Sequence, residues 1–354
     1  MQLGLNLGYW GAGNDADNLA LAVEADHLGY DVAWVAEAYG SDAPSVLSWV
    51  GALTTNLDLG AAVMQIPART PAMTAMTAAT IDALSGGRFR LGLGVSGPQV
   101  SEGWHGVRFA APLARTREYV DIVRMALARK NVEYAGEHFT LPLPDGPGKA
   151  LRLTVHPVRE KVPVYLAAVG PKNLELAGEI ADGWLAIFFS PEHSADLLDS
   201  VRTGAERAGR GSAQDRLAGF DVVPTVPVVI DDDLSRAAAS VAPYAALYIG
   251  GMGSREQNFY NRLACRMGFE DAAREIQDLY LDHKQRDAAA VVPFEFLDAT
   301  ALIGPRDRVK ERLGRYADAG VTTLSISTTA PTLEARLHVV RTMAELMGET
   351  GLRP

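Results

Sequence analysis

One local phrase recurs along the chain: a helical stretch, then one or two glycines, then a short run of apolar residues. It occurs at HLGYDVAWVAE (27–37), LSGGRFRLGLG (84–94), IADGWLAIFF (180–189) and DAGVTTLSIS (318–327). A glycine just past a helix adopts the left-handed conformation that ends the helix at little steric cost. The apolar runs do not alternate cleanly with polar residues, which is typical of strands buried on both faces. The phrase therefore predicts helix–strand units around a parallel sheet.

Eight such strands can be counted along the sequence. They start near Gln2, Asp31, Leu57, Arg88, Val162, Trp184, Phe220 and Thr322. Helix start signals lie between them at Asp17, Pro71 and Pro191. Eight strand–helix units in 354 residues match a (β/α)8 TIM barrel better than the alternative, an open doubly wound sheet. Because no linker composition interrupts them, we expect one α/β domain over residues 1–354.

Two stretches are longer than a strand–helix unit needs. Residues 131–161 contain a predicted hairpin, VEYAGEHFTL, followed by a loop rich in proline and glycine. Residues 250–303 indicate short helices inserted after the seventh strand. Long insertions in a compact domain are usually lids, binding loops or interface elements. We expect both insertions to contribute the outer wall of a ligand pocket.

The acidic composition restricts the partners of the chain. Lys and Arg number 33 against 43 Asp and Glu, a net charge of −10, which repels the phosphate backbone of nucleic acids. No apolar run is long enough to span a bilayer, and the N-terminus lacks signal-peptide features. The single cysteine, Cys265, cannot form an internal disulfide, and no metal-ligand spacing occurs. These features predict a cytoplasmic protein that acts on small molecules without a bound metal.

In a TIM barrel, function lies at the carboxyl ends of the strands. There the sequence places Asn6 after the first strand and Gln65 after the third. Glu37 and Tyr39 follow the second strand, and Glu37, shielded by apolar neighbours, could act as an acid or base. Alternatively, Glu37 pairs with an arginine while Asp42 caps the next helix. The amide of Gln65 suits the imide edge of a planar ring.

The fourth strand runs into the densest cluster of functional residue types, SGPQVSEGWHG (96–106), with Ser96 and His105. The residues from Gly92 to Gly97 spell G-x-G-x-x-G. However, Pro98 and a polar loop are expected where the dinucleotide-binding fingerprint requires a helix. We therefore reject that motif and interpret the glycines as room for a flat ligand close to the backbone.

The turn after the fifth strand predicts an anion site. Gly170 ends the strand, Pro171 fits the first helical position, and the N–H groups from Lys172 onward open a helix. Aligned N–H groups and the helix dipole attract anions to such an end. We expect a phosphate there, the alternative being an ordinary strand-to-helix turn.

Long stretches of the chain resemble a known family. They are AWVAEAYGSDAPS (33–45), AAVMQIPARTPAMTAMTAATIDALSGGRFRLGLGVSGPQVSEGWHG (61–106) and VYLAAVGPKNLELAGEIADGWL (164–185). These stretches are similar to the bacterial luciferase-like flavin superfamily, in the branch that uses the deazaflavin coenzyme F420 and includes methylenetetrahydromethanopterin reductase. The resemblance covers essentially the whole chain. It implies a (β/α)8 barrel, usually a homodimer, that holds the flavin ring in its mouth.

The resemblance also implies a set of cofactor contacts. A non-prolyl cis peptide bond would lie in a bulge within Ala62–Gln65 and back the ring. The turn at 170–172 would take the cofactor phosphate, and Ser96 and Gly97 would flank the tail. With the first strand included, the expected cofactor-binding residues are Asn6, Val63, Met64, Gln65, Ser96, Gly97, Gly170, Pro171 and Lys172.

The chain departs from the family at one place. Several deazaflavin members carry an Asp-His pair at the end of the second strand, where this sequence has Glu37 and Ala38. The histidine proton donor is therefore missing there, and Glu37, Tyr39, His105 or water would have to supply the proton.

The reaction that the resemblance implies is hydride transfer between C5 of the deazaflavin and a small organic substrate stacked on its face. The runner-up is an FMN-dependent monooxygenase. A flavin-binding protein without catalysis is a third possibility, and a cofactor-free barrel lyase or glycosidase is a fourth. The fourth is disfavoured because paired carboxylates do not stand at the strand ends.

Overall fold

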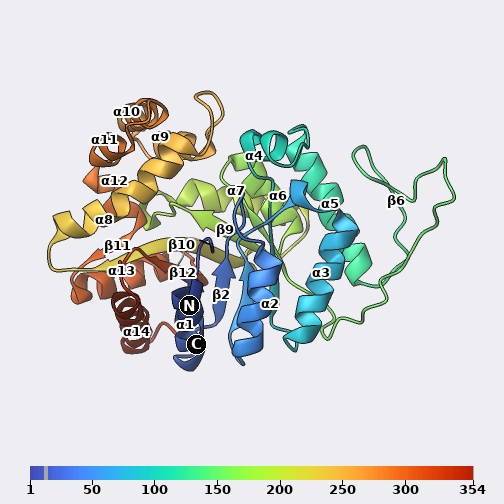
Figure 1. Cartoon of the computed structure of the whole chain (residues 1–354), viewed down its shortest axis with the longest axis horizontal. Coiled ribbons are helices and arrows are strands. Elements are labelled where there is room, and N and C mark those ends of the chain that lie inside the picture. Colours follow the sequence, from blue (N-terminus) through green and yellow to red (C-terminus); the bar gives the residue numbers. More distant parts are fainter. Residues whose placement is uncertain (12–14, 354) are drawn as a thin grey trace.

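The computed structural model describes residues 1–11 and 15–353, and its centre is a closed barrel of parallel strands (Figure 1). The eight barrel strands, in their order around the barrel, are β1 (Gln2–Asn6), β2 (Val32–Val35), β3 (Asp58–Ala61), β5 (Phe89–Gly94), β8 (Val164–Ala167), β9 (Gly183–Ile187), β10 (Asp221–Ile230) and β12 (Thr323–Thr328). The strand β12 pairs back with β1 and closes the ring. This confirms the (β/α)8 TIM barrel and rules out the open doubly wound sheet.

Helices surround the barrel on its outside (Figure 1). They are α1 (Asp15–His27), α2 (Ala43–Leu53), α3 (Pro71–Leu84), α5 (Pro112–Leu127), α6 (Pro171–Ile180), α7 (Ala195–Arg207), α13 (Arg306–Asp318) and α14 (Leu333–Glu349). Pro71 begins α3 as expected, whereas α1 begins two residues before Asp17. Pro191 opens a 3₁₀ turn instead of α7. Such turns often precede α-helices, and here the buried Ser190 hydroxyl donates to Glu192 at 2.8 Å across that turn.

Side chains on the barrel strands alternate between two cores. Outward-facing positions such as Leu3 and Leu91 pack against the helices in the larger apolar cluster. Inward-facing positions fill the barrel with a small cluster around Trp34, Tyr165 and Val223. The rings of Trp34 and Tyr165 meet edge to face with their centroids 5.3 Å apart. The barrel is therefore a packed core rather than a pore, and ligand sites lie at its ends.

The second insertion is helical, as expected. After α8 (Leu234–Ala246) comes a π-helical turn (Leu247–Gly251), followed by α9 (Phe259–Arg266), α10 (Glu270–Leu281), α11 (Gln285–Ala290) and α12 (Phe294–Thr300). Two short strands were not expected: β4 (Met64–Gln65), which pairs with β5, and β11 (Leu302–Gly304), which pairs with the end of β10. Strands of two and three residues are too short to show a periodicity.

The helix α4 (Pro98–Gly103) corrects one step of the sequence argument. We expected a loop after Gly97, but a helix of six residues begins at Pro98. The dinucleotide-binding interpretation still fails, because β5 belongs to a closed barrel rather than to an open sheet.

The first insertion forms the predicted hairpin, in which β6 (Tyr134–Ala135) pairs antiparallel with β7 (Thr140–Leu141). It lies on the side of the barrel opposite α8–α12 (Figure 1). That it walls the ligand pocket stays a prediction. The insertion connects the end of α5 to the start of β8, and its hairpin folds back along α5, where the Arg115 guanidinium lies over the Phe139 ring. That residues 1–354 fold as one unit stays a prediction.

Glu118 on α5 ties this hairpin to the barrel. Its carboxylate accepts hydrogen bonds from the backbone N–H groups of Glu137, His138 and Phe139, each at 2.9 Å. Burial raises the pKa of Glu118, but these hydrogen bonds outweigh it and leave the pKa below its ordinary value. A carboxyl pKa depressed by folding stabilises the folded state at neutral pH, and this stabilisation is lost as the pH falls through the folded pKa.

Replacing Glu118 by glutamine is expected to loosen the hairpin without unfolding the barrel. Glutamine removes the charge and turns one acceptor oxygen into a donor that faces N–H groups. Losing about 1–3 kcal/mol of local stability should speed hydrogen exchange of the amides at 137–139 about tenfold or more, measured by mass spectrometry at pH 7. The control is Glu133→Gln on the exposed face of the same hairpin. Equal exchange in Glu118→Gln and the parent protein would contradict this role.

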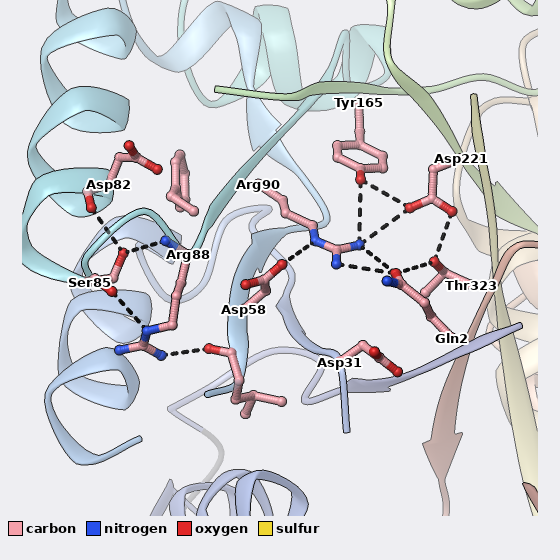
Figure 2. Close-up of polar contacts among 12 residues, drawn as sticks. Gln2, Asp31, Asp58, Asp82, Ser85, Arg88, Arg90, Tyr165, Asp221 and Thr323 are labelled. Atoms are coloured by element: carbon pink, nitrogen blue, oxygen red, sulfur yellow. Dashed lines mark hydrogen bonds and ion pairs between the residues drawn. The ribbon is translucent and has the colours of Figure 1, made fainter. Parts of the chain in front are cut away.

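Polar side chains close the amino-terminal end of the barrel around Arg90 (Figure 2). The Arg90 guanidinium donates to Asp58 at 2.8 Å, to Asp221 at 3.3 Å and to Gln2 at 3.2 Å. The Tyr165 hydroxyl donates to Asp221 at 3.0 Å. These residues come from β1, β3, β5, β8 and β10, so a single guanidinium cross-links five strands. Polar residues at this end of a TIM barrel serve stability rather than catalysis.

Candidate active site

A bulge at the end of β3 shapes the barrel mouth. The peptide bond between Ala62 and Val63 is cis, as the resemblance implied. The bulge lies so close to β5 that a Cβ on Gly94 would come within 2.5 Å of Val63, and one on Gly92 within 1.8 Å of the Ala61 carbonyl oxygen. The glycines of β5 therefore make room for this bulge, rather than for a ligand as the sequence suggested.

The bulge residues differ in their access to the mouth. Val63 is half-buried and packs on the inner barrel cluster. Met64 has no exposed surface and lies in the core between the strands and the helices. Met64 therefore has no surface with which to contact a cofactor.

The amide of Gln65 links two of the expected residues. Its Nε2 donates to the Ser96 hydroxyl at 2.7 Å, and its Oε1 lies 2.9 Å from Nε2 of His105. Because Oε1 can only accept, His105 carries a proton on Nε2 in this arrangement. Ser96 has a left-handed φ of 60°. The structure thus brings together three expected site residues that three separate segments supply.

Glu37 is held in an ion pair, which is the alternative that the sequence left open. Its carboxylate accepts hydrogen bonds from both terminal nitrogens of Arg69, at 2.7 and 2.8 Å. It also accepts the backbone N–H groups of Gln65 at 3.0 Å and Ala43 at 3.2 Å. The Glu37 side chain is only 7% exposed. A carboxylate engaged by four donors positions the neighbouring bulge and the start of α2.

Asp42 and Tyr39 follow Glu37 in the segment that leads to α2. Asp42 caps α2 by accepting the N–H of Ser45 at 2.9 Å, as the alternative predicted. Burial raises the pKa of Asp42, but the hydrogen bonds from Ser45 and the charge of Arg69 outweigh it and leave the pKa lowered. Tyr39 is 64% exposed and lies near Tyr9, so it belongs to a different part of the mouth from Gln65.

The turn between β8 and α6 has the expected geometry at its backbone. Gly170 caps the helix and Pro171 takes its first position. The Lys172 ammonium, however, pairs with Glu175 of the same helix at 2.9 Å and is 74% exposed. Asn6, on the opposite side of the mouth, donates to Thr225 at 3.3 Å.

Arg266 lies at the same turn, and sequence reasoning missed it. Its guanidinium donates to the carbonyl of Val169 at 2.9 Å. Burial and the nearby Arg262 lower the pKa of Arg266, which marks a cation that carboxylates do not neutralise. Arg266 comes from α9 in the second insertion, so no local pattern could connect it with the turn.

No helix within residues 1–11 and 15–353 combines the length and the apolar character needed to cross a membrane. In the same ranges, no three or more His, Cys, Asp or Glu side chains are grouped so that they could hold a metal ion.

Comparisons with known proteins agree with this geometry. The family model described as luciferase-like monooxygenase matches residues 9–323. A putative coenzyme F420-dependent oxidoreductase of Mycobacterium tuberculosis is 45% identical over 333 residues, which cover 92% of this chain and 95% of that protein. The 5,10-methylenetetrahydromethanopterin reductase of Archaeoglobus fulgidus is 29% identical, over 84% of this chain and 85% of that protein.

Among solved structures, the coenzyme F420-dependent tetrahydromethanopterin reductase of Methanopyrus kandleri superposes with a TM-score of 0.79 at 23% identity, and the match covers 99% of this chain and 97% of that one. This likeness supports the fold. The family match and the sequence relatives together confirm the resemblance on which the sequence argument rested. The chain belongs to the luciferase-like monooxygenase family.

Proposed function

We propose that this chain is a coenzyme F420-dependent oxidoreductase that transfers a hydride between C5 of the deazaflavin and a small organic substrate. The observation that carries the proposal is the 45% identity, over 92% of the chain, to a protein named as such an enzyme. The 5,10-methylenetetrahydromethanopterin reductase of Archaeoglobus fulgidus, which is 29% identical to this chain, is a reductase as well.

The residues at the barrel mouth fit such a cofactor. The amide of Gln65, the hydroxyl of Ser96 and the amide of Asn6 are neutral groups that suit the imide edge of a flavin-type ring. Ser96 and Phe188 are non-glycine residues with left-handed φ values of 60° and 50° near the ends of β5 and β9. Strained backbone of this kind gathers at ligand sites. When bound, the cofactor supplies or accepts the hydride.

The protein's own residues bind the cofactor and orient it toward the substrate. In our proposal, Gln65 and Ser96 hold the ring edge, and the turn at 170–172 with Arg266 holds the anionic phosphate. Glu37 positions Gln65 through its backbone N–H and does not donate the proton. Of the expected candidates, we propose His105 as the proton donor, because its Nε2 lies 2.9 Å from Oε1 of Gln65, beside the proposed ring edge.

Titration with coenzyme F420 tests the proposal. The cofactor fluorescence should change on binding, with a dissociation constant in the micromolar range or lower. Tight FMN binding without a response to coenzyme F420 would contradict the proposal and favour an FMN-dependent monooxygenase. Binding of coenzyme F420 without turnover over a broad substrate panel would favour a binding protein without catalysis.

The cation at the β8–α6 turn gives a sharper prediction. Arg266→Gln is expected to raise the dissociation constant for coenzyme F420 roughly ten- to a hundredfold, because a hydrogen bond to a charged group contributes about 1.5–3 kcal/mol. Lys172→Gln should have a smaller effect, since Glu175 already neutralises that lysine. The control is Arg274→Gln, whose side chain is 70% exposed and paired with Asp271. A larger effect of Lys172→Gln than of Arg266→Gln would contradict this assignment.

We further propose that the chain forms a homodimer through α2 and α3. These helices expose large apolar side chains, namely Trp49, Leu53, Met73, Met76 and Leu84. Contiguous exposed apolar side chains mark interaction surfaces, and the resemblance implies a second copy of this chain as the partner. The cytoplasmic location expected from the single cysteine stays a prediction.

Light scattering after size-exclusion chromatography tests the dimer. The parent protein should run as a dimer, and Trp49→Glu combined with Met76→Glu should give a monomer, because two charges would be buried in an apolar interface. The control is Leu151→Glu, a more exposed apolar side chain in the first insertion. A monomeric parent protein would contradict the proposal.

A further inference from the structure

Aromatic side chains from α8, the π-helical turn and α9 gather at one side of the barrel mouth. Phe188, directly after β9, packs against Tyr244 of α8 and Tyr248 of the π-helical turn, with ring centroids 5.7 and 5.8 Å apart. Tyr248 also packs on Tyr244 at 4.8 Å and on Tyr260 of α9 at 4.9 Å. All three tyrosines are half-buried. Because β9 ends at the mouth, Phe188 joins these rings to the proposed cofactor site.

Tyr9 completes the group from the other side of the mouth. It follows β1 by three residues and is 42% exposed. Burial raises the pKa of Tyr9. A hydrogen bond with Tyr248 lowers this pKa, and the nearby Tyr39 raises it further. Tyr9 thus lies beside Tyr248. We call Tyr9, Tyr244, Tyr248 and Tyr260 the tyrosine wall.

The π-helical turn is built to present Tyr248. A π turn widens the helix and leaves backbone carbonyls without their usual partners. The side-chain amide of Asn258 donates to the carbonyls of Tyr248 at 3.0 Å and Ile249 at 2.9 Å, and Asn258 is buried. Gly250 lets Tyr280 of α10 pack against the turn, because a Cβ on Gly250 would lie 2.5 Å from the Tyr280 Cβ. Such turns occur frequently at functional sites.

The tyrosine wall offers neutral hydrogen-bond donors on apolar faces. Burial, with a contribution from Tyr9, raises the pKa of Tyr260 to about 12. Burial likewise raises the pKa values of Tyr244 and Tyr248, so all these hydroxyls keep their protons at neutral pH.

We propose that the tyrosine wall is the substrate subsite and that the substrate is an uncharged, ring-containing carbonyl compound or alcohol. Aromatic faces pack well on a flat or alicyclic ring, and a phenol O–H donates to a carbonyl or hydroxyl oxygen. A phosphate or carboxylate would lose its hydration against these aromatic faces. The proposal rests on the proposed function, because it assigns the wall to the substrate of that oxidoreductase.

Binding of two small probes tests the subsite. Acetophenone and glucose 6-phosphate are titrated into the protein, with and without coenzyme F420, and followed by saturation-transfer NMR. Acetophenone should bind, and glucose 6-phosphate should bind at least tenfold more weakly. Tyr248→Phe and Tyr260→Phe should each raise the dissociation constant for acetophenone about three- to tenfold, as expected for one lost hydrogen bond.

The control is Tyr134→Phe, a tyrosine on the hairpin at the far side of the barrel. Neither this control nor the wall variants should change the affinity for coenzyme F420. If the parent protein fails to bind coenzyme F420, the proposed function fails, while the acetophenone titration without cofactor still tests the wall. If acetophenone does not bind, binds equally well to the wall variants, or binds no better than glucose 6-phosphate, the subsite proposal is overturned.

Discussion

Arg90→Met is expected to lower the free energy of unfolding by about 3 kcal/mol, because removing one partner of a buried ion pair strands the other. The methionine keeps most of the apolar stem but leaves Asp58 and Asp221 without their guanidinium. Arg90 is only 8% exposed, whereas both aspartates keep some exposure to water. Partial exposure places the loss at the lower end of what buried pairs cost. Figure 2 shows how many side chains depend on this one group.

Urea unfolding monitored by circular dichroism measures this effect. The matched control is Arg274→Met, an exposed arginine paired with Asp271, which should change stability by less than about 0.5 kcal/mol. Because Arg90 lies at the amino-terminal end of the barrel, opposite the mouth, folded Arg90→Met should bind coenzyme F420 with unchanged affinity. A change in that affinity, or a loss of stability no larger than the control's, would contradict the assignment.

The stability of Arg90→Met should depend on pH in a defined direction. Burial raises the pKa of Asp58, and the charge of Arg90 opposes that rise. Without Arg90 the pKa rises further. A carboxyl group whose folded pKa is raised destabilises the folded state above that pKa and loses this penalty as it becomes protonated. The stability deficit of Arg90→Met should therefore shrink as the pH falls from 7 toward about 5.

The barrel could be predicted because its signals are local and repeated. Each helix–glycine–strand phrase needs only a dozen neighbouring residues, and glycines such as Gly29, Gly87 and Gly320 do take the left-handed conformation that the argument requires. Such local signals could not explain a glycine that is required by contacts with residues distant in the sequence. Gly92 and Gly94 accommodate the neighbouring bulge, and nothing adjacent to them in the sequence reveals this.

The candidate site divides in the same way. Gln65, Ser96 and His105 were expected because each follows a strand end or lies in a dense polar loop, and strand ends meet in space. Arg266 and the tyrosine wall were not expected. Tyr9 follows β1, whereas Tyr244 and Tyr248 lie on α8 and the π-helical turn, and Tyr260 and Arg266 on α9 of the second insertion. The place of these helices at the mouth depends on how α8 and α9 fold back over the barrel. The sequence could indicate that an insertion is present, but not where its helices pack on the barrel.

Arg69→Met is expected to have the largest effect of the variants considered, lowering the free energy of unfolding by about 3–5 kcal/mol. Hydrogen bonding to Glu37 raises the pKa of Arg69 despite burial, and the pair is nearly inaccessible to water. Without Arg69, the Glu37 carboxylate keeps only the N–H groups of Gln65 and Ala43. Since Gln65 belongs to the bulge, affinity for coenzyme F420 should fall together with stability.

Combining variants separates a positioning role of Glu37 from a catalytic one. The double variant Glu37→Leu, Arg69→Met removes both charges, so it should be more stable than Arg69→Met alone, as measured by urea unfolding. If Glu37 only positions Gln65, then Glu37→Gln lowers cofactor affinity and turnover together and keeps the shape of the pH–rate profile. If Glu37 were the proton donor, Glu37→Gln would bind the cofactor normally but abolish turnover and remove one limb of that profile. The second outcome would return the catalytic role from His105 to Glu37.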